Sequence, residues 1–102
     1  MSISKAHLYD EADQMVSFYA GGLNYPGRLR ILRTLRDQGP KTVFDLAIEH
    51  PLSLSAISQH LDILSKKELV DFKPQYPYLI YSLNRARYEE AKQCLLDFFE
   101  ED

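Results

Sequence analysis

The chain has 102 residues, 45% of them hydrophobic, and a formal net charge of −3 at pH 7. This length favours a single domain over residues 1–102, whose modest core an oligomer interface would help to stabilise. Its apolar runs are shorter than the ~18 residues of a membrane span, and acidic residues stand where a signal peptide would be apolar, so we expect a cytoplasmic protein without membrane contact.

The first half of the chain predicts two helices separated by a glycine-containing turn. Apolar residues at helical spacing predict a first helix over residues 6–20, which would stop at Gly21 and Gly22. Pro26 lacks only an N–H that would be unpaired in a first turn, so a second helix is expected to start there. This second helix would end before Gly39, and its inner row would contain Leu29, Leu32 and Leu35.

Two further helices are marked by their N-terminal caps. Thr42, with Asp45 three residues on, has the pattern of a capping box and predicts a short third helix. Ser53 is a favoured N-cap for a fourth helix. Leu52 and Ile57, on either side of that cap, have the spacing of a hydrophobic staple, which would fix the direction in which the chain enters the helix.

The last third of the chain changes its period. Alternation over residues 69–73 and 78–83, separated by residues 74–77, predicts a β-hairpin, or wing. Asn84 can cap a last helix, whose apolar stripe contains Tyr88, Ala91, Leu95 and Phe98. The expected fold class is therefore mainly α with a small β-hairpin wing, in the order helix, helix, helix, helix, strand, strand, helix.

The fourth helix carries the clearest functional pattern. Its apolar positions Ile57, Leu61 and Leu64 would face a core, and its other side is polar and mostly uncharged: Ser55, Ser58, Gln59, Asp62 and Lys66. Small hydroxyls and an amide can hydrogen-bond base edges and phosphates without holding a helix away from the major groove. The helix therefore looks like the DNA-reading helix of a winged helix-turn-helix.

The distribution of charge is more informative than its sum. An isoelectric point near 5.6 argues against a generic nucleic-acid binder. Basic residues nevertheless concentrate in the middle of the chain and acidic residues at its ends, which fits a DNA face opposite a non-DNA face. The basic set is Arg28, Arg30, Arg33, Arg36, Lys41, Lys66, Lys67 and Lys73, and the acidic set is Asp10, Glu11, Asp13, Asp97, Glu100, Glu101 and Asp102.

Five segments of the chain resemble ArsR-type (arsenic-repressor-like) winged helix-turn-helix transcriptional regulators. They are PGRLRILRTL at residues 26–35, DLA at 45–47, ISQHLDIL at 57–64, ELV at 68–70 and IYSL at 80–83, at the family's usual separations. The serine-any-histidine-leucine signature at residues 58–61 is the most specific. The resemblance implies a homodimer that binds double-stranded operator DNA as a transcriptional regulator, with repression as the expected outcome.

The resemblance also implies which residues meet DNA and which meet the second protomer. Residues of the fourth helix, the wing and neighbouring basic positions would contact DNA: Arg28, Lys41, Ser53, Leu54, Ser55, Ser58, Gln59, His60, Lys66, Lys73 and Tyr76. The first and last helices would form the dimer interface through Leu8, Ala12, Met15, Tyr19, Tyr88, Ala91, Leu95, Phe98 and Phe99.

Simpler interpretations remain open for some of these residues. His60 points between the core face and the polar face, so a partly buried, hydrogen-bonded histidine is an alternative to a phosphate contact. The arginines of residues 28–36 can instead form only a solvated helix face. The seven tyrosines are better explained by core and interface packing than by a ligand pocket.

The chain departs from the family pattern at three places. His50 and Pro51 replace a leucine and a glycine between the third and fourth helices. Glu68 stands where a glycine usually closes the reading helix. The wing tip KPQYPY lacks the family's usual glycine and arginine, so Lys73 is its only cation.

We expect no metal site, no other cofactor and no catalytic activity. The family's sensors use a cysteine pair or triplet on the third helix, or Asp and His ligands on the last, and neither set occurs here. Cys94, the single cysteine, excludes an intramolecular disulfide and reads as a buried thiol. No nucleophile-base constellation or glycine-rich phosphate loop is present, so an enzyme is excluded. The alternative to a DNA-binding regulator is a winged-helix protein-interaction module that has lost DNA binding.

Overall fold

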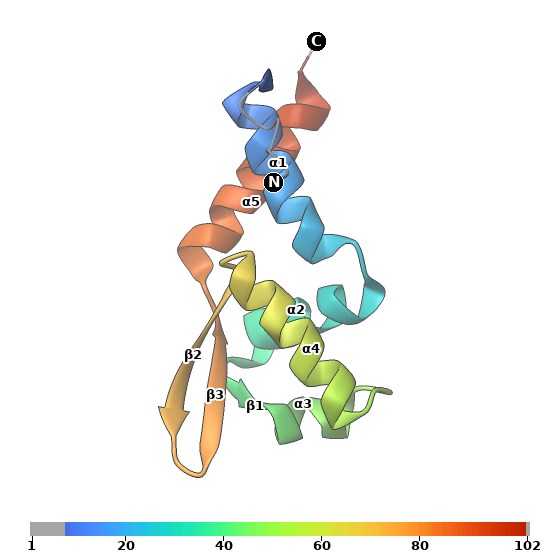
Figure 1. Cartoon of the computed structure of the whole chain (residues 1–102), viewed down its shortest axis with the longest axis vertical. Helices are drawn as coiled ribbons and strands as arrows, with labels where there is room; N and C mark the ends of the chain where they lie inside the picture. The colour runs from blue at the N-terminus through green and yellow to red at the C-terminus, as the bar shows by residue number, and fades with distance from the viewer. Residues whose placement is uncertain (1–7, 102) are drawn as a thin grey trace, which may run out of the picture.

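The computed structural model describes residues 8–101, which form five helices and a three-stranded antiparallel sheet. The predicted fold class, mainly α with a hairpin wing, is confirmed (Figure 1). No helix within this range is long and apolar enough to cross a membrane. In chain order the elements are α1 (Glu11–Leu23), α2 (Pro26–Gln38), β1 (Lys41–Thr42), α3 (Val43–Glu49), α4 (Leu54–Lys66), β2 (Val70–Gln75), β3 (Tyr78–Leu83) and α5 (Arg85–Glu100).

The molecule has two distinct ends. Helices α1 and α5 pack against each other and project together at one end, whereas the tip of the β2–β3 hairpin lies at the other, with α3 and the first turn of α4 (Figure 1). The sheet has the order β1-β3-β2, so the short strand β1 ties the start of α3 to the wing.

The predicted caps are present in the structure. The Thr42 hydroxyl accepts a hydrogen bond from the Asp45 N–H at 3.0 Å, and the Asp45 carboxylate accepts one from the Thr42 N–H at 3.1 Å. The bond from the Thr42 N–H to the carboxylate favours its charged form and lowers the pKa of Asp45. The Ser53 hydroxyl accepts from the Ala56 N–H at 3.1 Å, and the side-chain amide oxygen of Asn84 accepts from the Arg87 N–H at 3.1 Å. Local side-chain chemistry therefore sets where α3, α4 and α5 begin.

The predicted end of the first helix was wrong. Helix α1 continues through Gly21 and Gly22 to Leu23, and the start predicted at residue 6 lies outside the described residues. A Cβ atom on Gly22 would lie only 3.0 Å from the Leu69 side chain. The glycines thus allow α1 to approach the α4–β2 connection closely, and this contact outweighs their low helix propensity.

The predicted wing was too short, and one strand was missed. Strand β2 continues through Pro74 and Gln75, so only Tyr76 and Pro77 form the turn rather than residues 74–77. Strand β1 has two residues, and its Lys41 pairs with Tyr81 of β3. Two residues are too few to show an alternating pattern in the sequence.

Helix α4 ends in the left-handed conformation that a glycine usually provides. Glu68 has φ 62°, its N–H donates to the Ser65 carbonyl, and the Leu69 N–H donates to the Leu64 carbonyl. This is the hydrogen-bond pattern of a Schellman motif, and Leu64 and Leu69 are both fully buried beside it. Burial of this leucine pair compensates for the backbone strain at Glu68.

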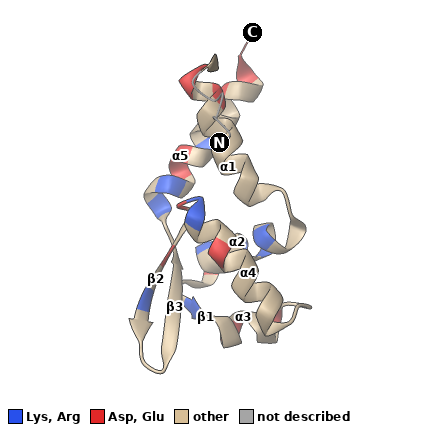
Figure 2. Cartoon of the chain, in the orientation of Figure 1, with Lys and Arg blue, Asp and Glu red and all other residues tan. Residues whose placement is uncertain are grey.

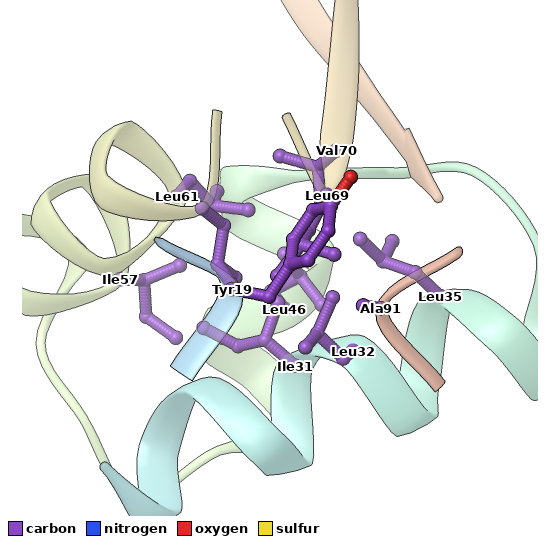
Figure 3. Close-up of a cluster of buried hydrophobic side chains, with 11 residues drawn as sticks. Tyr19, Ile31, Leu32, Leu35, Leu46, Ile57, Leu61, Leu69, Val70 and Ala91 are labelled. Atoms are coloured by element: carbon purple, nitrogen blue, oxygen red, sulfur yellow. The ribbon is translucent and has the colours of Figure 1, made fainter. Parts of the chain in front are cut away.

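The core joins α4 to α1, α2, α3 and β2 (Figure 3). Ile57, Leu61 and Leu64, the inner row predicted for the fourth helix, all have 0% exposure, which confirms that prediction. They pack in one cluster with Tyr19, Ile31, Leu32, Leu35, Leu46, Leu69, Val70 and Ala91.

The inner and outer rows of α4 should differ in their contribution to stability. We expect Leu61→Ala to lower the free energy of unfolding by about 2–5 kcal/mol, because it removes apolar contacts and leaves a cavity. Leu54→Ala makes the same change in the same helix at a side chain that is 44% exposed, so its effect should stay below about 1 kcal/mol. Urea unfolding followed by circular dichroism measures both, and equal losses would contradict the assigned orientation of α4.

Candidate nucleic-acid interface

The outward face of α4 is polar and accessible. Ser55, Ser58 and Gln59 are exposed on its first turns, beside α3, and Leu54 and the capping Ser53 are exposed at its start. The Gln59 amide offers both a donor and an acceptor, the combination that pairs with adenine in a major groove. The structure therefore places the short hydrogen-bonding side chains together on the side of α4 opposite its buried row.

The wing is aromatic rather than cationic. Tyr76 at its tip is 91% exposed, and Lys73 is exposed on β2. The rings of Phe72 and Tyr81 lie 5.7 Å apart across the two strands. Pairing of the strands extends to Gln75 opposite Tyr78, so the two-residue turn is held by a complete ladder.

Charge is only partly separated along the molecule, because α3, α4 and β2 also carry acidic residues, among them Asp45, Asp62 and Asp71. Figure 2 shows acidic residues at the start of α1 and the end of α5, while the lysines of β1 and β2 lie in the wing half. Several cations already have partners: Lys66 Nζ lies 2.9 Å from Asp62, and Arg36 Nε lies 2.7 Å from Asp37. Such pairs reduce the positive field below what the number of basic residues indicates.

Arg28 was expected to contact phosphate, and the structure contradicts this. Its side chain is only 4% exposed. Its Nε donates to the Gly22 carbonyl at 3.1 Å, and its Nη2 donates to Asn24 Oδ1 at 2.5 Å. A guanidinium buried by such bonds is not free to reach DNA. Helical spacing does not reveal this, because the bonding partners come from the preceding helix and turn.

His60 is the partly buried, hydrogen-bonded histidine that the sequence allowed as an alternative. Its Nδ1 lies 3.1 Å from Arg28 Nη1, and its ring lies 5.8 Å from that of Tyr25. Burial, and secondarily the Arg28 charge, lower the pKa of His60 below its ordinary value. His50 is more deeply buried, and its Nδ1 contacts the Leu46 carbonyl at the end of α3.

Two residues assigned to the dimer interface belong to the core of the protomer. Tyr19 is 2% exposed and donates its hydroxyl proton to Glu90, and Ala91 is 4% exposed. Both lie between α1 and α5, so they are not available to a second protomer. Of the other candidates, Met15, Tyr88 and Leu95 are partly buried, and Leu8, Ala12, Phe98 and Phe99 are exposed.

The same end contains an apolar groove that the sequence did not reveal. It has a volume of about 450 Å³ and lies between α2 and α5. Leu29 and Leu96, 42% and 41% exposed, line it together with Leu32, Leu95 and Phe99. Leu29 was predicted to lie in the inner row of the second helix, so its exposure corrects that prediction.

The described part of the chain holds no group of three or more His, Cys, Asp or Glu side chains arranged to bind a metal ion. Cys94 is partly buried, and burial raises the pKa of its thiol. A protonated thiol in an apolar setting is a poor nucleophile and a poor metal ligand.

The chain is similar in sequence to known proteins. Residues 25–71 match the model of the bacterial regulatory protein, arsR family. The transcriptional repressor SdpR of Bacillus subtilis (strain 168) is 32% identical over 73 residues, which are 72% of this chain and 80% of that protein.

Two solved structures extend the similarity to the fold. A possible transcriptional regulator for arsenical resistance is 32% identical, with a TM-score of 0.71 and coverage of 86% of this chain and 85% of that one. HlyU from Vibrio cholerae N16961 is 26% identical, with a TM-score of 0.72 and coverage of 90% and 98%. The chain therefore belongs to the ArsR family of bacterial regulatory proteins and is a DNA-binding transcriptional regulator, not an enzyme.

Proposed function

We propose that this chain is a homodimeric repressor that binds operator DNA through α4 and responds to no metal. The observation that carries the proposal is the face of α4 formed by Ser55, Ser58 and Gln59, exposed on a helix whose opposite row is fully buried. Such a helix presents base-reading groups on a rigid support. Repression, rather than activation, is supported by the similarity to a transcriptional repressor.

We expect different residues of α4 to serve base recognition and phosphate binding. We expect Gln59→Ala to lose about 1–3 kcal/mol of discrimination between operator and random DNA, because it removes a bidentate base contact. Lys66→Ala should instead weaken binding to every sequence and reduce the salt dependence by about one counterion unit. The operator is first sought by gel shift in the DNA upstream of the protein's own gene, and fluorescence anisotropy then measures both variants.

The control for this experiment is Gln93→Ala, the same change at an exposed position of α5. It should alter neither discrimination nor salt dependence. If Gln59→Ala keeps full discrimination, α4 does not read base edges through this residue, and the groove assignment is wrong.

The dimer interface is supported by the apolar surface of the α1–α5 end. Phe98 and Phe99 are 44% and 76% exposed in the last turns of α5, next to the groove that Leu29 and Leu96 line. Exposed aromatic and aliphatic side chains this close together are typical of an interface rather than of a free surface. A second copy of the chain, packed with the same end, would bury them.

A charge in this surface should therefore prevent dimerisation. We expect Phe99→Glu to halve the mass measured by light scattering without unfolding the protomer, because its ring is mostly exposed. Phe44→Glu places the same charge at a phenylalanine that is 56% exposed on α3, in the wing half, and should leave the dimer intact. A Phe99→Glu protein with an unchanged dimer mass would contradict this interface.

Metal ions should not regulate the protein. Operator affinity and thermal stability are expected to stay unchanged on addition of zinc, cadmium or arsenite, because the family's ligand positions lack the required side chains. Cys94→Ser should retain DNA binding apart from a small packing loss. Metal analysis of purified protein, together with binding titrations, tests this expectation, and stoichiometric zinc would contradict it.

One surface favours a second function, that of a protein-interaction module. Phe44 and Ile48 of α3 are 56% and 84% exposed, and the Phe44 ring lies 6.3 Å from that of Tyr78 on the wing. An apolar surface here, beside a wing with one cation, is suited to a protein partner as well as to DNA. A folded dimer that binds neither operator nor random DNA in low salt would favour this alternative.

A further inference from the structure

Arg28 joins three parts of the molecule from a buried position. It belongs to the first turn of α2, and it donates to the Gly22 carbonyl of α1, to Asn24 in the α1–α2 turn, and to His60 of α4. Its guanidinium also lies 4.9 Å from the centre of the Tyr25 ring. The contact to His60 is therefore a direct polar connection between the α1–α2 corner and the reading helix.

The chemistry of this contact defines where the His60 proton is. A guanidinium has only N–H donors and stays charged at any pH of interest, so His60 Nδ1 must accept the bond from Arg28 Nη1. Nδ1 accepts only in the neutral imidazole, in the tautomer with its proton on Nε2. In the protonated ring Nδ1 also carries a proton, so it would face the Arg28 N–H as a donor, and the hydrogen bond would be lost.

The surroundings of His60 do not compensate a positive charge. Arg28 of α2 is the charged group that faces it, the Tyr25 ring lies tilted beside it, and Gly27 lies close to the imidazole edge. Among residues 8–101, no carboxylate forms a hydrogen bond or ion pair with His60. The exposed Asp62, two residues on, is paired with Lys66.

We infer that Arg28 and His60 are positioning residues for DNA binding: neutral His60 ties α4 to the α1–α2 corner, and protonation of His60 releases the helix. This inference rests on the proposed function. Operator affinity should then fall as the pH is lowered, opposite to the gain that a histidine touching a phosphate directly would produce. Neither residue needs to contact DNA for this effect.

The pH range of this effect follows from the linkage between protonation of His60 and folding. The pKa of His60 in the folded protein lies below its ordinary value near 6.5, so the tie is intact at neutral pH. Below about 6.5 the unfolded chain takes up a proton that the folded protein resists, so stability falls as the pH decreases. Below the folded pKa the tie itself breaks, and operator affinity should fall by up to about tenfold per pH unit.

Two variants of His60 test the assignment. In His60→Asn the amide oxygen can take the place of Nδ1 and accept from Arg28, so we expect near-normal operator affinity at pH 7.5 and no loss between pH 7.5 and 5.5. In His60→Gln the amide instead resembles Nε2 and misses Arg28, so affinity should be reduced at both pH values. Anisotropy titrations give the affinities, and circular dichroism checks folding at each pH.

Gly27→Ala tests the same contact without changing any charge. An added Cβ would lie 3.1 Å from His60 Nε2, so the ring must shift. Affinity should fall at pH 7.5, and the loss relative to the unaltered protein should shrink at low pH, where protonation has already broken the tie. The salt dependence of binding should be unchanged in the His60 and Gly27 variants, because no phosphate contact is lost.

Three results would overturn the inference: affinity that rises as the pH falls in the unaltered protein, pH dependence that persists in His60→Asn, or equal behaviour of His60→Asn and His60→Gln. If the folded protein binds no DNA at any pH, the proposed function fails instead. Imidazole ¹⁵N NMR distinguishes these two failures, because it reports the His60 tautomer and its titration without DNA. A proton found on Nδ1 at pH 7.5 would show that His60 does not accept the bond from Arg28.

Discussion

Burial of one row of α4 is the constraint on which the rest of the structure depends. Ile57, Leu61 and Leu64 have no exposed surface, and they contact the core contributed by α1, α2, α3 and β2. Because residues three and four apart share one face of a helix, burial of this row turns the opposite row outward. The hydroxyls and the amide that face solvent are therefore placed by apolar packing, which requires nothing from DNA.

Apolar packing alone does not fix the position of a helix along its own axis. Polar contacts supply this second constraint. Ser53 caps the start of α4, the Schellman motif at Glu68 closes its end, and His60 connects its middle to Arg28. The first two contacts lie within α4 and set where it begins and ends. Hydrogen bonds are directional, so the His60–Arg28 bond, which joins α4 to α2, restricts the helix position more narrowly than apolar burial does. A DNA-reading helix needs this precision because base contacts tolerate only small displacements.

The two ends of the molecule have different physical character. Both ends expose aromatic side chains. The α1–α5 end combines them with the acidic residues of both termini, and the wing end combines them with exposed hydroxyls, an amide and a few lysines. Acidic groups repel phosphate, so the acidic residues of the α1–α5 end leave the wing end the more favourable of the two for an anionic partner. An acidic isoelectric point is compatible with DNA binding under this arrangement.

The sequence by itself determined what local chemistry controls: the fold class, the caps at Thr42, Ser53 and Asn84, and the two faces of α4. These follow from hydrogen bonds within a few residues and from helical periodicity. Only the tertiary structure decided that α1 continues through Gly21 and Gly22, that Arg28 is buried, and that Tyr19 and Ala91 belong to the protomer core. Each of these depends on contacts with residues outside the helix concerned, and helical periodicity does not encode such contacts.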